Sequence, residues 1–110
     1  MRAYLIDEIP VQEMAHINGF LTKHAIRSSL DQIFWVQIPN DLLNETQYLH
    51  VQCRPHVFAV ELGPGWIRLE LFVRTLNSMR CDCPAYCTPS QRDYIFRFAD
   101  GMIEQLNIRT

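Results

Sequence analysis

Three of the four cysteines, Cys81, Cys83 and Cys87, lie within seven consecutive positions of the chain. The fourth, Cys53, precedes His56 by three positions. Thiolate and imidazole groups are the ligands that Zn²⁺ prefers, four at a time and in tetrahedral geometry. These residue types therefore predict a metal site, provided that the fold brings Cys53 and His56 to the later cysteines.

A predicted β-hairpin supplies that fold-back. Residues 56–62 and 66–74 are rich in apolar and β-branched side chains, and a short glycine-containing loop separates them. The chain enters and leaves such a hairpin at the same end, and the linker to the later cysteines spans at most about 20 Å when extended. We therefore expect Cys53 and His56 to lie beside residues 81–87.

His50 competes with His56 as the nitrogen ligand. Residues 47–53 alternate in polarity and predict a strand, on which Cys53 and His50 point to opposite faces. We therefore expect His56, rather than His50, to accompany the cysteines.

The ligand spacing favours zinc without matching a familiar motif. A Cys-x2-His pair with a Cys-x-Cys-x3-Cys segment differs from the repeated Cys-x2-Cys of zinc knuckles and from the spacings typical of iron–sulfur proteins. Zinc is the first choice of cofactor, and an iron–sulfur cluster held by all four cysteines is the alternative on ligand count. Either the zinc ion or the cluster would hold the 81–87 loop in one conformation, since this loop has little hydrophobic core beneath it.

Cys87 supports a second hypothesis, a thiol redox protein with a reactive cysteine in the 81–87 loop. It directly precedes Thr88, the predicted N-cap of the last helix. The partial positive charge at a helix N-terminus lowers the pKa of a thiol, and Arg80 and Arg92 would add to that effect. The Cys-x-x-Cys motif typical of thiol–disulfide enzymes is absent from the sequence.

A third hypothesis is a plain dimerisation or interaction module with inert thiols, because free cysteine often behaves as a small buried apolar residue. Trp66 and Phe72 fall on the second face of the predicted sheet. A second copy of the chain is the simplest cover for an apolar face. The expected partner is accordingly a homodimer mate or another protein, docked through the sheet.

The remaining elements follow from periodicity and capping signals. Apolar residues recur at helical spacing over 10–26 and after Thr88, which forms a capping box with Gln91. Residues 33–38 and 47–53 predict strands in addition to the hairpin. Since consecutive strands usually pair, we predict an α+β fold: a four-stranded antiparallel meander with an N-terminal and a C-terminal helix packed on one face.

The composition sets further limits. The chain has 110 residues and a formal net charge of −2, which suits one domain over residues 1–110 and gives no electrostatic basis for binding nucleic acid or an anionic membrane. Residues 1–15 lack the apolar core of a signal peptide, so we expect a cytoplasmic location. No phosphate loop or nucleophile elbow occurs. The leading hypothesis is therefore a small metal-binding interaction domain without catalytic activity.

Overall fold

The fold combines a twisted antiparallel sheet with two long helices on one of its faces. The computed structural model describes residues 2–77 and 81–110. In these residues seven strands and three α-helices are present, which confirms the predicted α+β class. In chain order the elements are β1 (Ala3–Ile6), η1 (Val11–Glu13), α1 (Met14–His24), β2 (Ile26–Arg27), β3 (Ile33–Gln37), η2 (Asn40–Leu42), α2 (Glu45–Leu49), η3 (Val51–Cys53), β4 (His56–Gly63), β5 (Trp66–Glu70), β6 (Phe72–Thr75), β7 (Ala85–Tyr86) and α3 (Pro89–Gln105).

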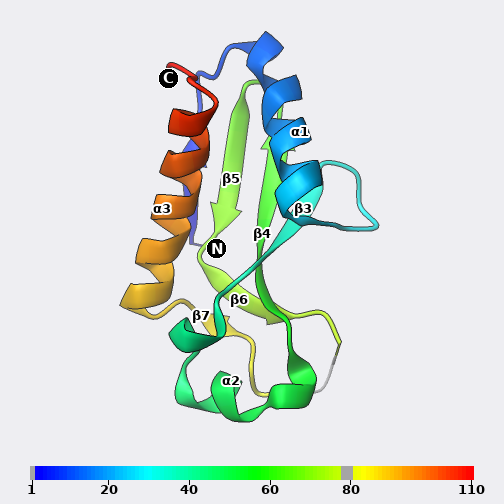
Figure 1. The fold of residues 1–110 in the computed structure, drawn as a ribbon, viewed down its shortest axis with the longest axis vertical. Helices are drawn as coiled ribbons and strands as arrows, with labels where there is room; N and C mark the ends of the chain where they lie inside the picture. The colour runs from blue at the N-terminus through cyan, green and yellow to red at the C-terminus, as the bar shows by residue number, and fades with distance from the viewer. Residues whose placement is uncertain (1, 78–80) are drawn as a thin grey trace.

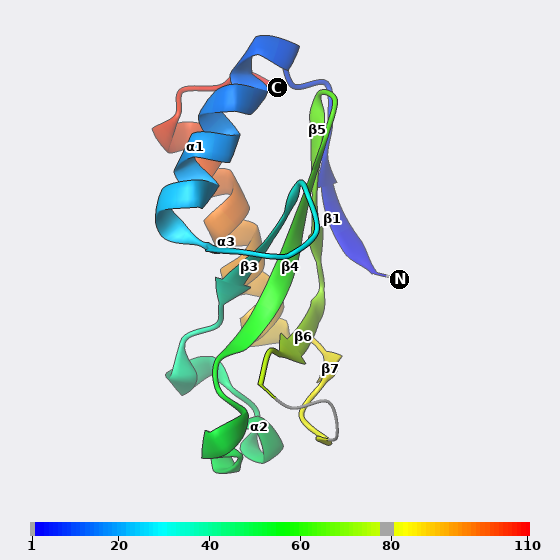
Figure 2. The same ribbon diagram turned by 90° about the vertical axis from the view of Figure 1, so that its right-hand side faces the viewer.

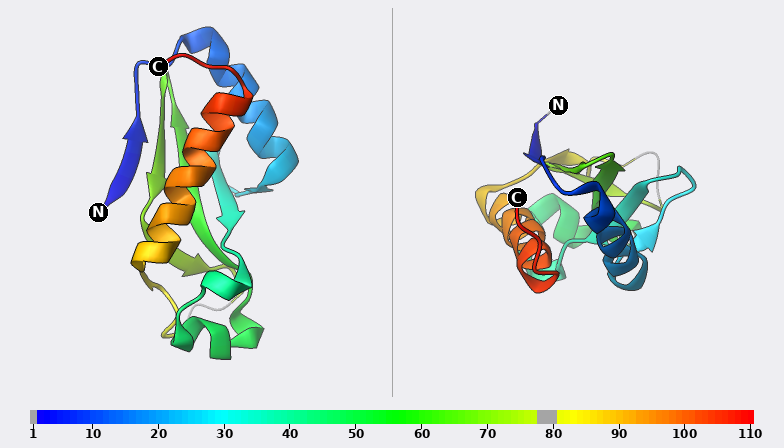
Figure 3. Two further views of the ribbon diagram at one scale, coloured as in Figure 1. Left: turned by 60° about the vertical axis from the view of Figure 1, so that its left-hand side comes forward. Right: turned by 90° about the horizontal axis from the view of Figure 1, so that it is seen from above.

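Helices α1 and α3 lie side by side against the same face of the sheet, and the view from above shows the other face open (Figure 3). Helix α1 buries Ile17 and Leu21 completely, and α3 buries Ile95 and Met102. These side chains belong to one core with the inward residues of the central strand β4, such as Phe58. The helical spacing of apolar residues therefore positions both helices as expected.

Helix α3 begins where the sequence predicts. The Thr88 hydroxyl accepts a hydrogen bond from the Gln91 N–H at 3.2 Å, and the Gln91 side chain accepts one from the Thr88 N–H at 2.9 Å. Pro89 occupies the first helical position, where its missing N–H leaves no hydrogen bond unmade. This capping box fixes the direction in which the chain leaves the loop that carries the later cysteines.

The sheet is not the predicted four-stranded meander. The strand order is β1-β5-β4-β3-β2, with β6 pairing to β4 and β7 pairing to β6. Residues 47–53, expected to be a strand, form α2 and η3 instead. The reason is local: the Asn44 side chain accepts from the Gln47 N–H at 2.8 Å, and the Asn44 N–H donates to the Gln47 side chain at 3.1 Å. This second capping box starts a helix where side-chain alternation suggested a strand.

The second arm of the predicted hairpin is broken into β5 and β6. Val60 pairs with Leu69, whereas His56 pairs with Thr75, so four steps along β4 correspond to six steps along the opposite arm. Two extra residues are accommodated in this break, which bends β6 away from β5 (Figure 1). The bend directs the end of the hairpin toward α2 and so sets the position of the cysteine-bearing loop.

Candidate metal centre

Two segments far apart in sequence meet at one end of the sheet. The first consists of α2 and η3, and the second is the loop that leads into β7; both lie below β6 in two perpendicular views (Figures 1 and 2). His50 and Cys53 come from the first segment, and Cys81 and Cys83 come from the second. The predicted fold-back of Cys53 onto the later cysteines is therefore confirmed for Cys81 and Cys83.

One ligand atom from each of these four residues lies within 4.8 Å of every other. The His50 Nδ1 is 3.2 Å from the Cys81 Sγ and 2.9 Å from the Cys83 Sγ. The Cys81 Sγ is 2.9 Å from the Cys53 Sγ and 2.8 Å from the Cys83 Sγ. None of the four cysteines, all of which are among the described residues, forms a disulfide. The four residues, which we call the Cys3His cluster, could therefore hold a single metal ion.

The cluster is slightly tighter than a filled zinc site. Zinc–sulfur bonds of about 2.3 Å place tetrahedral sulfur ligands about 3.8 Å apart. The sulfur separations of 2.8 and 2.9 Å would thus widen by roughly 1 Å around an ion.

Burial divides the four ligands into two pairs. Cys53 and Cys83 are 5% and 1% exposed, whereas His50 and Cys81 are half-buried. Hydrogen bonding with the Cys53 and Cys83 thiols lowers the pKa of Cys81 to about 7. Burial, and the neighbouring Cys81, raise the pKa of Cys83. Cys81 therefore loses its proton more readily than Cys83, and a bound ion would displace the protons that remain on the thiols.

The turn geometry explains why His50, and not the expected His56, joins the cysteines. His50 is the N-cap of η3, and Cys53 ends it; the Cys53 N–H donates to the His50 carbonyl at 3.0 Å. Side chains three residues apart eclipse one another in a 3₁₀ turn, so both point to the same side. The His-x2-Cys spacing of residues 50–53 is the sequence signal for this pair. It indicates a shared site only if these residues form a turn, and the predicted strand places the two side chains on opposite faces.

His56 lies outside the Cys3His cluster. Its side chain is 0% exposed, and neither ring nitrogen has a hydrogen-bond partner among the described residues. Burial lowers the pKa of His56, and electrostatic interactions with Arg54 and His50 lower it further. His56 is therefore a neutral residue of the β4 interior in this structure.

Cys87 also lies outside the cluster and packs against the hydrophobic core. Burial raises the pKa of its thiol to about 11, which outweighs the opposing effect of Arg92. The pKa of Cys87 is therefore raised, whereas its position beside a helix N-terminus led us to expect a lowered pKa. Arg80, the other cation expected to act on Cys87, lies outside the described residues. The thiol with the lowered pKa is instead Cys81.

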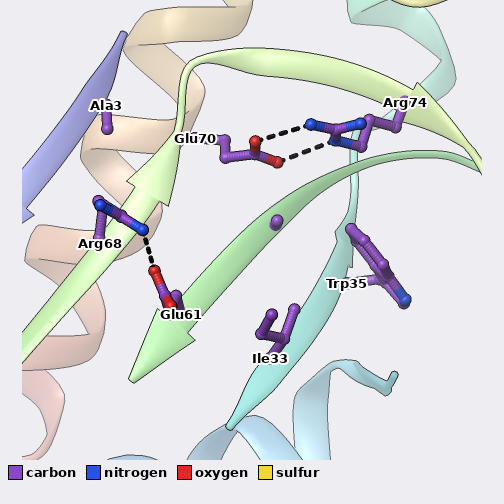
Figure 4. Close-up of a pocket in the computed structure, with 8 residues that line it drawn as sticks. Ala3, Ile33, Trp35, Glu61, Arg68, Glu70 and Arg74 are labelled. Atoms are coloured by element: carbon purple, nitrogen blue, oxygen red, sulfur yellow. Dashed lines mark hydrogen bonds and ion pairs between the residues drawn. The ribbon is translucent and has the colours of Figure 1, made fainter. Parts of the chain in front are cut away.

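The open face of the sheet carries a shallow hollow of about 360 Å³ (Figure 4). Trp35 and Ile33 lie on one side of it, and Arg68 and Arg74 lie on the other. Arg68 pairs with Glu61, and Arg74 forms two hydrogen bonds with Glu70, at 3.0 and 2.9 Å, so the positive charges are balanced.

The aromatic residues expected on this face are already in contact with arginines of the same chain. The Arg68 guanidinium lies 5.8 Å from the Trp66 ring centre, and that of Arg74 lies 5.1 Å from the Phe72 ring centre. Both aromatic side chains are half-buried as a result. Docking of a second copy through this face stays a prediction.

No protein-family model matches the chain, and no curated protein and no solved structure matches it either. Among the helices of residues 2–77 and 81–110, none has the length and apolar character needed to cross a membrane. The fold and the site together define the protein as an α+β domain with a Cys3His cluster.

Proposed function

We propose that this protein is a zinc-binding domain in which His50, Cys53, Cys81 and Cys83 hold one structural ion. The observation that carries the proposal is the mutual approach of four ligand atoms to within 4.8 Å, from two segments about thirty residues apart. Three thiolates and one imidazole are a common ligand set of structural zinc.

The donor set favours zinc over an iron–sulfur cluster. Four cysteine ligands are the usual requirement of such clusters, and this would need Cys87 in addition to the three thiols of the Cys3His cluster. Cys87 packs instead against the hydrophobic core, with a pKa raised to about 11. A single tetrahedral ion therefore fits the geometry better.

Four protein ligands also favour a structural role over a catalytic one. A catalytic zinc keeps one coordination position open for water or substrate, whereas a structural site fills all four with side chains. Here the ion would join the α2–η3 turns to the loop before β7. The surface beside it exposes Leu49 and Val51, at 67% and 60%, and would then present a fixed conformation to a protein partner.

Metal content decides the proposal. The purified protein, reconstituted with Zn²⁺ and passed over a desalting column, should retain about one zinc per chain by elemental analysis. Cys83→Ser should lose most of this zinc because it removes a buried ligand. Cys87→Ser is the matched control, since the same substitution a few residues away should leave the zinc content unchanged.

A substoichiometric zinc content in the wild-type protein would overturn the proposal. Equal zinc content in Cys83→Ser and in the wild type would exclude the Cys3His cluster as the site, even if the protein binds zinc elsewhere.

A second candidate function is thiol redox chemistry within the same cluster, favoured by the 2.9 Å between the Cys53 and Cys81 sulfurs and by the lowered pKa of Cys81. With oxidised glutathione as the oxidant, the Cys81 thiolate attacks the disulfide and releases one glutathione thiolate. Cys53 then displaces the second glutathione and closes an intramolecular disulfide.

The two functions differ in how zinc affects this reaction. Intact-mass measurement should show a loss of two hydrogens after treatment of the metal-free protein. If the site is structural, saturation with zinc should prevent that loss, because the thiolates are then bound to the ion.

A further inference from the structure

Two buried glutamines connect the cysteine loop to the two helix starts. Gln47 lies in the first turn of α2, Gln91 lies in the first turn of α3, and both side chains are 0% exposed. The Gln47 Nε2 donates to the Cys83 carbonyl at 3.0 Å, and the Gln91 Nε2 donates to the Gln47 Oε1 at 2.9 Å. A continuous hydrogen-bonded path therefore runs from the backbone of a cluster ligand to the start of α3.

The Cys83 carbonyl depends on this contact. Cys83 is 1% exposed, so its carbonyl needs a hydrogen-bond donor from the protein. A buried carbonyl without a donor destabilises the folded state. The side chain of Gln47 reaches across from α2 and supplies the missing donor.

The orientation of the Gln47 amide is determined by its neighbours. Its Oε1 accepts from two donors, the Asn44 N–H at 3.1 Å and the Gln91 Nε2 at 2.9 Å. Rotating the amide by half a turn would place its NH₂ group against both donors and its oxygen against the Cys83 carbonyl. Only one orientation satisfies all three contacts, and in that orientation the amide donates to Cys83.

Gln91 is fixed in the same way. Its Oε1 accepts from the Thr88 N–H at 2.9 Å, and its Nε2 also donates to the Leu42 carbonyl at 3.0 Å. The capping box of α3 therefore sets the amide of Gln91, and Gln91 in turn sets the amide of Gln47. Both glutamines combine a capping role with a contact to another part of the chain.

We propose that Gln47 is a positioning residue for the metal site, which holds the Cys81–Cys83 loop in ligand geometry through the Cys83 carbonyl, with Gln91 orienting its amide. This inference rests on the proposed zinc function and deepens it. A group that holds a ligand in place affects metal affinity without touching the metal, typically by 10–100-fold when it is removed.

Gln47→Glu tests the proposal directly. Glutamate keeps the shape and the acceptor oxygen that faces Asn44 and Gln91, but at pH 7.5 it replaces the donor to Cys83 with an acceptor. We expect the dissociation constant for Co²⁺, used in place of Zn²⁺, to rise by about tenfold or more. The visible absorption bands of the bound Co²⁺ should also shift, since they report the ligand geometry.

Asn44→Ala is the matched control. It removes the acceptor for the Gln47 N–H and weakens the same capping box, but it leaves the donation from Gln47 to Cys83 in place. We expect a lower melting temperature with Co²⁺ affinity within about threefold of the wild type and an unchanged spectrum. Gln91→Glu should have a Co²⁺ affinity between those of Gln47→Glu and Asn44→Ala, because it loses the donor that orients the Gln47 amide.

Three outcomes decide between the two proposals. Wild-type affinity and spectrum in Gln47→Glu would overturn the positioning role while leaving zinc binding intact. An equal loss of affinity in Asn44→Ala would also overturn it, because general weakening of α2 would then explain the effect. Absence of Co²⁺ binding by the wild-type protein would overturn the zinc function and this inference together.

If Gln47→Glu does not fold, the wild-type protein itself provides the test. By NMR, the side-chain NH₂ of Gln47 should be protected from solvent exchange, and its proton that faces Cys83 should shift when Zn²⁺ is added. A rapidly exchanging amide with no shift would overturn the proposal.

Discussion

His56 is the residue whose protonation the fold opposes most directly. It is buried in β4 without a partner for either ring nitrogen among the described residues, and burial is the largest cause of its lowered pKa. Folding therefore favours the neutral imidazole, and an unfolded chain binds a proton more readily at this position. The stability due to neutral His56 is complete above the unfolded pKa of about 6.5 and is lost as the pH falls below it.

We predict that His56→Leu reduces the pH dependence of stability. In the presence of a chelator, urea unfolding at pH 7.5 and at pH 5.5 should show a smaller loss of unfolding free energy for this variant than for the wild type. Equal pH dependence in His56→Leu and the wild type would contradict the prediction.

Only some of the four residues in the Cys3His cluster could be predicted from the sequence. Cys53, Cys81 and Cys83 were proposed as a shared group, and the structure brings them together. The choice between His50 and His56 depended on whether residues 47–53 form a strand or a turn, because side chains alternate in a strand and eclipse at three-residue spacing in a 3₁₀ turn. A local pattern of polarity does not distinguish these two cases.

At the scale of elements, α3 was the most predictable part of the fold. Its start depends on Thr88, Pro89 and Gln91, which interact with one another within a single turn. Because these hydrogen bonds join residues within one turn, the start of α3 can be predicted from the local sequence alone. The α2 capping box is of the same kind, but its second member, Gln47, also begins a segment whose side chains alternate in polarity as they do in a strand.

We predict that Thr88→Ala destabilises the protein by about 1 kcal/mol because the Gln91 N–H loses its acceptor at the helix start. Thermal unfolding should show a decrease of roughly 4 °C for a chain of this size. Thr22→Ala is the control: Thr22 is exposed in the last turn of α1, and its hydroxyl donates to Asn18 of the same helix. A decrease of similar size in Thr22→Ala would show that the capping box of α3 has no special importance.

At the scale of the whole molecule, the Cys3His cluster joins two segments that lie about thirty residues apart in the chain. Zinc that binds the folded chain and not the unfolded one raises the unfolding free energy by about 2.7 kcal/mol at a hundredfold excess over its dissociation constant. The cluster would therefore contribute a sizeable part of the stability of a small domain.

We predict that zinc raises the melting temperature of the wild-type protein by roughly 10 °C under those conditions. Addition of a chelator should reverse the shift. The Cys83→Ser variant should melt at the same temperature with and without zinc, whereas Cys87→Ser should respond like the wild type. A zinc-independent melting temperature in the wild type would show that metal binding, if present, is not coupled to folding.

The α+β class, the two long helices with their common face, and the meeting of Cys53 with Cys81 and Cys83 could all be predicted from the sequence, because periodicity, capping and hairpin return are local properties of the chain. The tertiary structure alone decided the strand order, the break between β5 and β6, and the choice of His50 as the fourth member of the cluster. Each of these depends on which of several locally acceptable conformations lets distant segments pack together. That choice is made by burial of the core and by contacts such as Gln47 with Cys83, which link residues that the sequence keeps far apart.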